Sequence, residues 1–181
     1  MSLTTLFYFL GASILLTLAP GPDNTFIVAQ GLSRGRKAAI VTALGMCSGI
    51  SVHTLAAALG ISALLYASAY AFTVVKYAGA AYLFYLAYKA IQEHEIMLRM
   101  SETAGPRFFL LYRRGFIMNV LNPKVGLFFL AFLPQFVDPQ GMPVGLQMLL
   151  FGLLFMAQAV LLFVSIGFLS GSAGHLILKR P

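Results

Sequence analysis

The sequence contains very little charge. Of its 181 residues only 9% are Asp, Glu, Lys or Arg, whereas 60% are apolar. Soluble globular domains carry about 25% charged and about 45–50% apolar residues. A chain of this length cannot hide so much apolar surface from water. The composition therefore excludes a soluble domain and predicts an all-α membrane protein, a polytopic helical bundle.

Other absences narrow the function. There is no tryptophan, so Tyr and Phe must supply any interfacial anchors, and the single cysteine, Cys47, excludes an internal disulfide framework. No Cys/His cluster or carboxylate pair suggests a metal. No phosphate-binding loop suggests ATP hydrolysis. With no catalytic constellation either, we expect no enzyme, no cofactor and no metal.

Apolar runs divide the chain into five predicted spans of about 20 residues or more. They cover approximately residues 1–32, 38–65, 71–88, 115–133 and 144–169, with a break near 66–70, a polar loop at 89–114, a turn at 134–143 and a tail at 170–181. No Lys or Arg precedes the first run, and Pro-Gly-Pro follows it. We therefore interpret this run as a retained span rather than a cleaved signal peptide.

The basic residues predict the orientation. Ten of the twelve Lys and Arg residues lie in the first loop, the third loop and the tail, all on one side of the predicted bundle. Cytoplasmic loops carry an excess of Lys and Arg, so this side is expected to be cytoplasmic and the N-terminus outside. The net charge of +7 is thus explained by basic residues at the membrane surface rather than by binding to nucleic acid.

Small residues recur at helix-packing intervals. Gly45 and Gly49 are four residues apart, as are Gly167 and Gly171. Such pairs let two helix backbones approach closely in lipid. We prefer packing within the bundle as the interpretation, and a homo-oligomer interface is the alternative.

Two interruptions are the most informative features. The first is Pro20-Gly21-Pro22-Asp23-Asn24, and the second is Asn119-Val120-Leu121-Asn122-Pro123-Lys124. Proline removes a backbone donor and glycine loosens the chain, so neither helix is expected to continue smoothly. Backbone groups freed at membrane depth must face protein or water. At 1.5 Å rise per residue, Asp23 and Lys124 each lie roughly 15 Å from the cytoplasmic edge, near the midplane.

Broken helices at matching places in two halves of a chain are typical of transporter binding sites. The alternative is a pair of proline kinks that only shape the bundle. The matching depth and the polar neighbours favour function here. On this interpretation residues 1–90 form a first three-span repeat, 91–114 a cytoplasmic loop, and 115–181 a second, incomplete repeat of inverted topology.

Each polar residue at the breaks has two interpretations. Asp23 would carry a proton or hold a substrate ammonium, or it would cap the helix that restarts after Pro22. Lys124 would bind a substrate carboxylate, pair with Asp23, or extend to the interface. The amides of Asn24, Asn119 and Asn122 would bind substrate or satisfy broken backbone.

Two further residues are weaker candidates. His53 is a lone histidine in the second predicted span. A hydrogen-bonded packing role is the common one for such a residue, and a proton relay is the alternative. Lys76 lies near the outer end of the third span, where extension to the interface is the preferred interpretation.

These segments resemble the LysE/RhtB family of amino-acid exporters. The resemblance rests on Pro20 to Asn24 with Gly31-Leu32-Ser33-Arg34-Gly35, on residues 72–83, on Gly115 to Lys124, and on Phe132-Leu133-Pro134-Gln135-Phe136. It covers nearly the whole chain. Members usually have about six hydrophobic segments and somewhat more than 200 residues, whereas five are predicted here.

The resemblance implies an exporter in the bacterial cytoplasmic membrane. Its substrates would be neutral amino acids or derivatives, of the threonine, homoserine, homoserine lactone or leucine type, and the proton gradient would drive export. The expected partners are therefore a small-molecule substrate, protons and lipid. The alternative is a non-transporting membrane protein with a structural or assembly role, such as a truncated exporter that lacks its sixth span.

Overall fold

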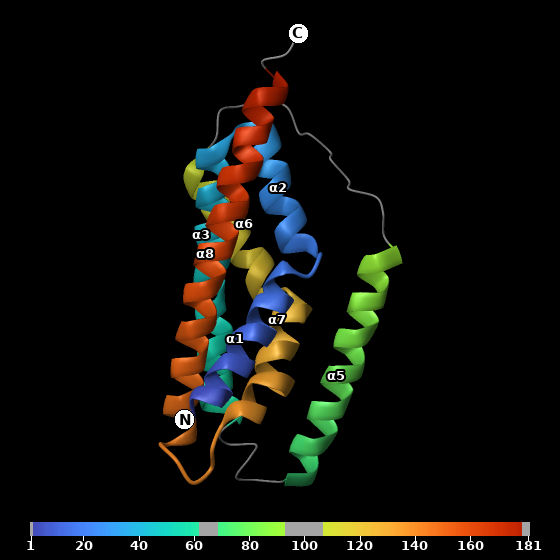
Figure 1. The fold of residues 1–181 in the computed structure, drawn as a ribbon, viewed down its shortest axis with the longest axis vertical. Coiled ribbons are helices and arrows are strands. Elements are labelled where there is room, and N and C mark those ends of the chain that lie inside the picture. Colours follow the sequence, from blue (N-terminus) through green and yellow to red (C-terminus); the bar gives the residue numbers. More distant parts are fainter. Residues whose placement is uncertain (1, 62–68, 93–106, 179–181) are drawn as a thin grey trace.

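The computed structural model describes residues 2–61, 69–92 and 107–178, and this part of the chain is helical with no strand. Figure 1 shows an elongated bundle of helices, with α5 standing beside the others. The helices are α1 (Leu3–Leu18), α2 (Pro22–Arg34), α3 (Arg36–Ala56), α5 (Ala69–Gln92), α6 (Phe108–Val120), α7 (Pro123–Leu127) and α8 (Val144–Leu178). The π-helical turns η1 (Ala57–Ile61) and η2 (Phe128–Phe132) extend α3 and α7, and the 3-10 turn η3 (Leu133–Phe136) follows η2.

Two of the long elements are bent at the predicted interruptions. The axes of α1 and α2 differ by 56°, and those of α6 and the segment Pro123–Phe136 by 46°. Pro22 and Pro123 each open the second half-helix, where a missing backbone N–H costs no intrahelical bond. Each proline therefore ends one half-helix and starts the next.

An all-α membrane bundle, as the composition predicts, is confirmed. Within the described residues, two helices are long and apolar enough to cross a membrane, Arg36–Gly60 and Val144–Leu176, and each bent pair would add one more span. The sequence predicts five. The remaining span falls on α5, where Lys76 and five tyrosines dilute the apolar residues, and it stays a prediction.

Two predicted boundaries are wrong. Helix α6 begins at Phe108, so seven residues assigned to the polar loop are helical, because Leu111 in this segment is fully buried and fixes it against the bundle. Helix α8 continues to Leu178 through the predicted tail, because Gly171 and Gly174 pack against α3 and α2. The predicted break at 66–70 and the surface loop lie mostly outside the described residues.

Glycines bring the long helices together. A Cβ on Gly45 would collide with the Tyr112 carbonyl of α6, and one on Gly171 would collide with the backbone of Arg36 in α3. The preferred interpretation of both glycine pairs, packing within the bundle, is confirmed. The link from α2 to α3 is short, because Gly35 alone separates the two helices. Its φ of 84° is a backbone conformation that favours glycine.

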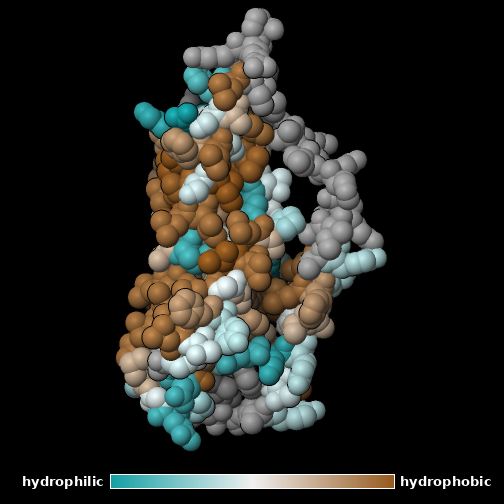
Figure 2. All heavy atoms as spheres, in the orientation of Figure 1, coloured by the Kyte–Doolittle hydropathy of each residue, from teal (hydrophilic) through white to brown (hydrophobic). Residues whose placement is uncertain are grey.

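An aromatic cluster fastens α1 to the second half of the chain. Phe9 is fully buried and lies 4.6 Å from Phe151 of α8, 5.4 Å from Phe136 and 6.2 Å from Phe128 between ring centroids. Away from this core, hydrophobic residues cover much of the face shown in Figure 2. Only 33% of the apolar stretch of α8 is buried inside the protein, so the rest of this stretch is available to contact lipid.

Candidate functional site

Asp23 lies at the start of α2 and is only 3% exposed. Its place in the first helical turn puts its carboxylate at the positive end of the helix dipole. The Asn119 amide of α6 donates to Asp23 Oδ2 at 3.1 Å, and Asp23 Oδ1 has no hydrogen-bond partner. The Asn119 amide therefore holds one carboxylate oxygen, and the side-chain amide of Asn122 is a second group that interacts with this carboxylate.

Asn24 closes the end of α1. Its side-chain nitrogen donates to the carbonyls of Thr17 at 3.0 Å, Leu18 at 3.3 Å and Ala19 at 2.9 Å. Pro22 removes the backbone donor that the Leu18 carbonyl would use, and the carbonyls of Thr17 and Ala19 lack theirs because α1 ends at Leu18. The amide thus satisfies the broken backbone, one of its two predicted roles.

Lys124, at the start of α7, reaches the same end of α1. Its ammonium donates to the carbonyls of Leu16 and Ala19, both at 3.0 Å. A cation is favourable there because the C-terminal end of a helix is negative. Among the described residues no ion pair within 4.0 Å joins Lys124 to Asp23, although both line one cavity. The two charges therefore share surroundings without direct contact.

The second break is held by side chains of its own segment and of α3. Asn122 Oδ1 accepts the Lys124 backbone N–H at 3.0 Å and so caps α7. His53 Nε2 lies 3.0 Å from the Asn119 carbonyl at the end of α6, and a carbonyl partner requires a proton on that nitrogen. His53 thus touches the residue that holds Asp23.

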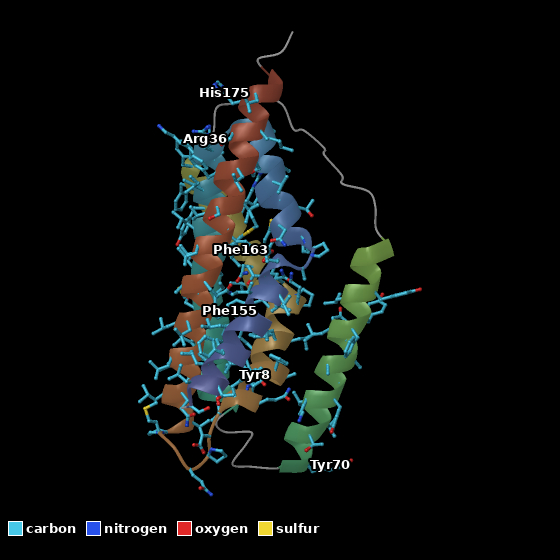
Figure 3. The ribbon with its side chains drawn as sticks, in the orientation of Figure 1. Tyr8, Arg36, Tyr70, Phe155, Phe163 and His175 are labelled. Atoms are coloured by element: carbon cyan, nitrogen blue, oxygen red, sulfur yellow. The ribbon has the colours of Figure 1, made fainter. Side chains whose placement is uncertain are left out.

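A buried amide next to Thr17 was not among the predicted site residues. Gln158 of α8 donates to Thr17 Oγ1 at 3.0 Å and to the Phe155 carbonyl at 3.0 Å, and its own carbonyl oxygen is buried without a partner. Its signal in the sequence is a lone amide within an otherwise apolar run. In Figure 3, Phe155 and Phe163 of the same helix lie near the level of the break between α1 and α2.

A small cavity joins these groups. Its volume is about 10 Å³, enough for roughly one water molecule. Its lining consists of Leu16, Thr17, Asp23, Ile50, Asn119, Lys124, Val125, Phe155 and Phe163. Several buried polar atoms of the neighbouring side chains also have no hydrogen-bond partner: Asn24 Oδ1, Asn119 Oδ1, Asn122 Nδ2 and Gln158 Oε1. The break region therefore combines unused donors and acceptors with apolar walls.

Lys76 lies elsewhere. It lines a separate, mostly apolar cavity of about 290 Å³ between α5 and the segment from Ala131 to Gln135. Its ammonium lies 5.6 Å from the centre of the Tyr77 ring. The structure therefore brings together Asp23, Asn24, Asn119, Asn122, Lys124 and His53, and leaves Lys76 apart. Within the described residues, no group of three or more His, Cys, Asp or Glu side chains could hold a metal ion.

Apolar helices that enclose a buried carboxylate and a lysine at two helix breaks define an integral membrane protein with a polar site within its bundle. Residues 14–181 match the family model described as LysE type translocator. The chain therefore belongs to the LysE type translocator family.

Similar proteins come from three bacteria. An uncharacterized membrane protein of Pseudomonas aeruginosa is 36% identical over 137 residues, covering 73% of this chain and 63% of the relative. One of Vibrio cholerae is 31% identical over 131 residues, covering 72% and 64%, and one of Bacillus subtilis is 28% identical over 169 residues, covering 88% and 80%. The matches thus span just under two thirds of the first two relatives. No solved structure matches the chain significantly.

Proposed function

We propose that this protein exports neutral amino acids or their derivatives across the cytoplasmic membrane, driven by the proton gradient. The observation that carries the proposal is Asp23, a buried carboxylate held by the Asn119 amide at the meeting point of two broken helices. Ionisable residues inside membrane helices mark substrate and proton routes. Membership of a translocator family supports the same function.

The site has groups for both ends of an amino acid. Asp23 Oδ1 and the carbonyls that end α1 would accept hydrogen bonds from a substrate ammonium. The Lys124 ammonium would attract the carboxylate. Leu16, Ile50 and Val125 supply the apolar wall that a small side chain would contact.

The conformation described is a closed one. A cavity of about 10 Å³ is far smaller than the roughly 300–1,000 Å³ of typical ligand sites. Transport then requires the half-helices to separate, in line with alternating access around a fixed midplane site. Asp23 would take up a proton from the outside as the substrate leaves to that side, and it would release the proton to the cytoplasm before the next substrate binds.

Asp23→Asn tests this mechanism. The amide keeps the size of the side chain and its capacity to accept the Asn119 hydrogen bond, and it removes the titratable proton of the carboxyl group. In proteoliposomes loaded with a panel of amino acids, we expect the variant to lose most of the efflux driven by a pH gradient. Efflux equal to that of the parent at every pH would contradict the proposal.

Asp138→Asn is the matched control, because Asp138 is exposed in the turn before α8. It should leave efflux unchanged. If the parent protein inserts correctly and moves no amino acid of the panel, the alternative of a non-transporting membrane protein is favoured instead.

The proposed orientation has its own test. The sequence places basic residues on one side of the bundle, so a reporter fused after Arg36 should report the cytoplasm and one fused after Pro139 the periplasm. Alkaline phosphatase and a fluorescent protein, which are active on opposite sides, provide the two readouts. The reverse pattern would overturn an N-terminus outside the cell.

A further inference from the structure

Buried polar side chains extend beyond the Asp23 cavity in both directions along the broken helix. Ser13 and Thr17 of α1 are 0% and 4% exposed, and Gln30 of α2 is 8% exposed. Ser13 Oγ and Gln30 Oε1 have no hydrogen-bond partner. Buried polar groups in folded proteins are almost always satisfied, so each unsatisfied group needs a reason.

These residues share one face of the broken helix. Ser13 and Thr17 are four residues apart, and the Thr17 hydroxyl donates to the Ser13 carbonyl at 2.9 Å. Asp23 and Gln30 are seven residues apart, two turns of α2, and both belong to its buried face. At 1.5 Å per residue, Gln30 lies roughly 10 Å from Asp23 along the helix.

Gln158 connects the first half of this row to α8. Its amide nitrogen binds Thr17, and its carbonyl oxygen adds another buried acceptor without a partner. The row runs from Ser13 through Thr17 and Gln158 to Asp23 and on to Gln30. In this closed conformation the Phe9 cluster covers the end of the row beyond Ser13, and the separation of the half-helices proposed for transport would uncover it.

We propose that this row is a water path that gives the Asp23 carboxyl access to protons from both directions. Water is the ligand that fits, because the unpartnered groups are a hydroxyl, amide oxygens and a carboxylate oxygen placed about one or two helical turns apart. The inference rests on the proposed role of Asp23 in proton coupling. It adds Ser13, Thr17, Gln30 and Gln158 as residues that hold the water.

Cysteine reactivity tests the path directly. The protein has one cysteine, Cys47, which can be replaced by alanine to give a background without thiols. Ser13→Cys and Gln30→Cys then report on the two ends of the path. Vesicles are treated with Ag⁺, which is small enough to follow water, and the unreacted thiols are counted with a fluorescent maleimide after denaturation in detergent.

Two lipid-facing positions serve as matched controls. Leu15→Cys lies beside Ser13 on α1, with Leu15 72% exposed on the bundle surface. Leu169→Cys lies at the level of Gln30, because Ser170 packs against Gly31. Only a hydrated thiol ionises to the reactive thiolate, so we expect Ag⁺ to block both path positions at least about tenfold faster than the controls.

A rate equal to the controls at either path position would overturn a continuous path. Membrane level and thermal unfolding are measured for each variant, and Thr17→Cys, nearly the same size as threonine, replaces Ser13→Cys if the latter does not insert. The outcome separates this inference from the proposed function. Fast Ag⁺ labelling together with unchanged efflux in Asp23→Asn would support the water path and contradict the coupling role of Asp23. Slow labelling together with lost efflux would contradict the path and support the coupling role.

Discussion

At the first break, α1 ends at Leu18 and α2 resumes at Pro22. At the second, α6 ends at Val120 and α7 resumes at Pro123. Both restart with a proline followed by a charged residue. The Asp23 carboxylate at the first restart has one oxygen without a hydrogen-bond partner, whereas the Lys124 ammonium at the second is engaged by two carbonyls.

The difference indicates a division of labour. Lys124 of the second break donates a hydrogen bond to a carbonyl at the end of α1, in the first break. The start of α7 in the second break is capped locally by the Asn122 side chain. The first break is thus held both by its own Asn24 and by the distant Lys124, and it carries the buried carboxylate of Asp23. A proline-broken helix in a membrane can therefore be a structural support or a reactive site, and its hydrogen bonds distinguish the two.

Lys124→Met should have the largest effect on stability. It removes two hydrogen bonds to the end of α1 and leaves both carbonyls without that donor. Hydrogen bonds to charged groups contribute about 1.5–3 kcal/mol each, so we expect a loss on the order of 3 kcal/mol in the free energy of unfolding. Thermal unfolding in detergent micelles measures it.

Lys76→Met is the control for this change. Lys76 is a partly exposed lysine of α5 with no carbonyl contact among the described residues, and its loss should stay within about 0.5 kcal/mol. Equal losses for the two variants would mean that Lys124 does not hold the first break.

Asn24→Ala should have the next largest effect. The amide contacts three carbonyls of α1, and a typical hydrogen bond contributes about 0.5–1.5 kcal/mol, so a loss of about 2 kcal/mol is expected. Asn122→Ala, which removes the cap of α7 and an amide that interacts with the Asp23 carboxylate, should cost about 1 kcal/mol. The same unfolding assay compares them, and a larger loss for Asn122→Ala would reverse the comparison between the two breaks.

The smallest expected effect is the coupling between the two charges. Asp23 and Lys124 line one cavity without an ion pair, so a double-mutant cycle of Asp23→Asn and Lys124→Met should give a coupling energy of about 0.5–1 kcal/mol. The double variant should be slightly more stable than the sum of the single losses predicts. Strict additivity would show that the residues act apart, and a coupling of several kcal/mol would indicate a direct pair.

The positions of both breaks could be predicted because proline acts on the backbone of its own segment. The close approach of helices at Gly45 and Gly171 could also be predicted. A glycine has no side chain, so the backbone of a neighbouring helix can pack directly against it. Such local rules do not specify partners. The carbonyls that bind Lys124 belong to Leu16 and Ala19, and a backbone carbonyl carries no signal in the residue type.

Contacts between distant segments were the part that the sequence could not supply. Asn119 is 96 residues from Asp23, and Gln158 is 141 residues from Thr17. The helical start at Phe108 was also missed, because the nearby arginines gave the segment a loop-like composition although its apolar residues pack on the bundle. Charge on the exposed side of a helix and charge in a loop are indistinguishable without knowing which side is buried.

The single residue between α2 and α3 limits how the protein can move. Gly35 adopts a left-handed backbone conformation, and its N–H is bonded to the Gly31 carbonyl, so the joint is short and internally tied. Gly21, by contrast, is fully extended, with φ 177° and ψ 176°. The short link at Gly35 therefore restricts movement of α2 relative to α3. The extended link at Gly21 restricts movement of α1 relative to α2 less. We therefore expect the cavity to open by a rotation of α1 about Gly21, resisted by the hydrogen bonds that Asn24 and Lys124 make to the end of α1.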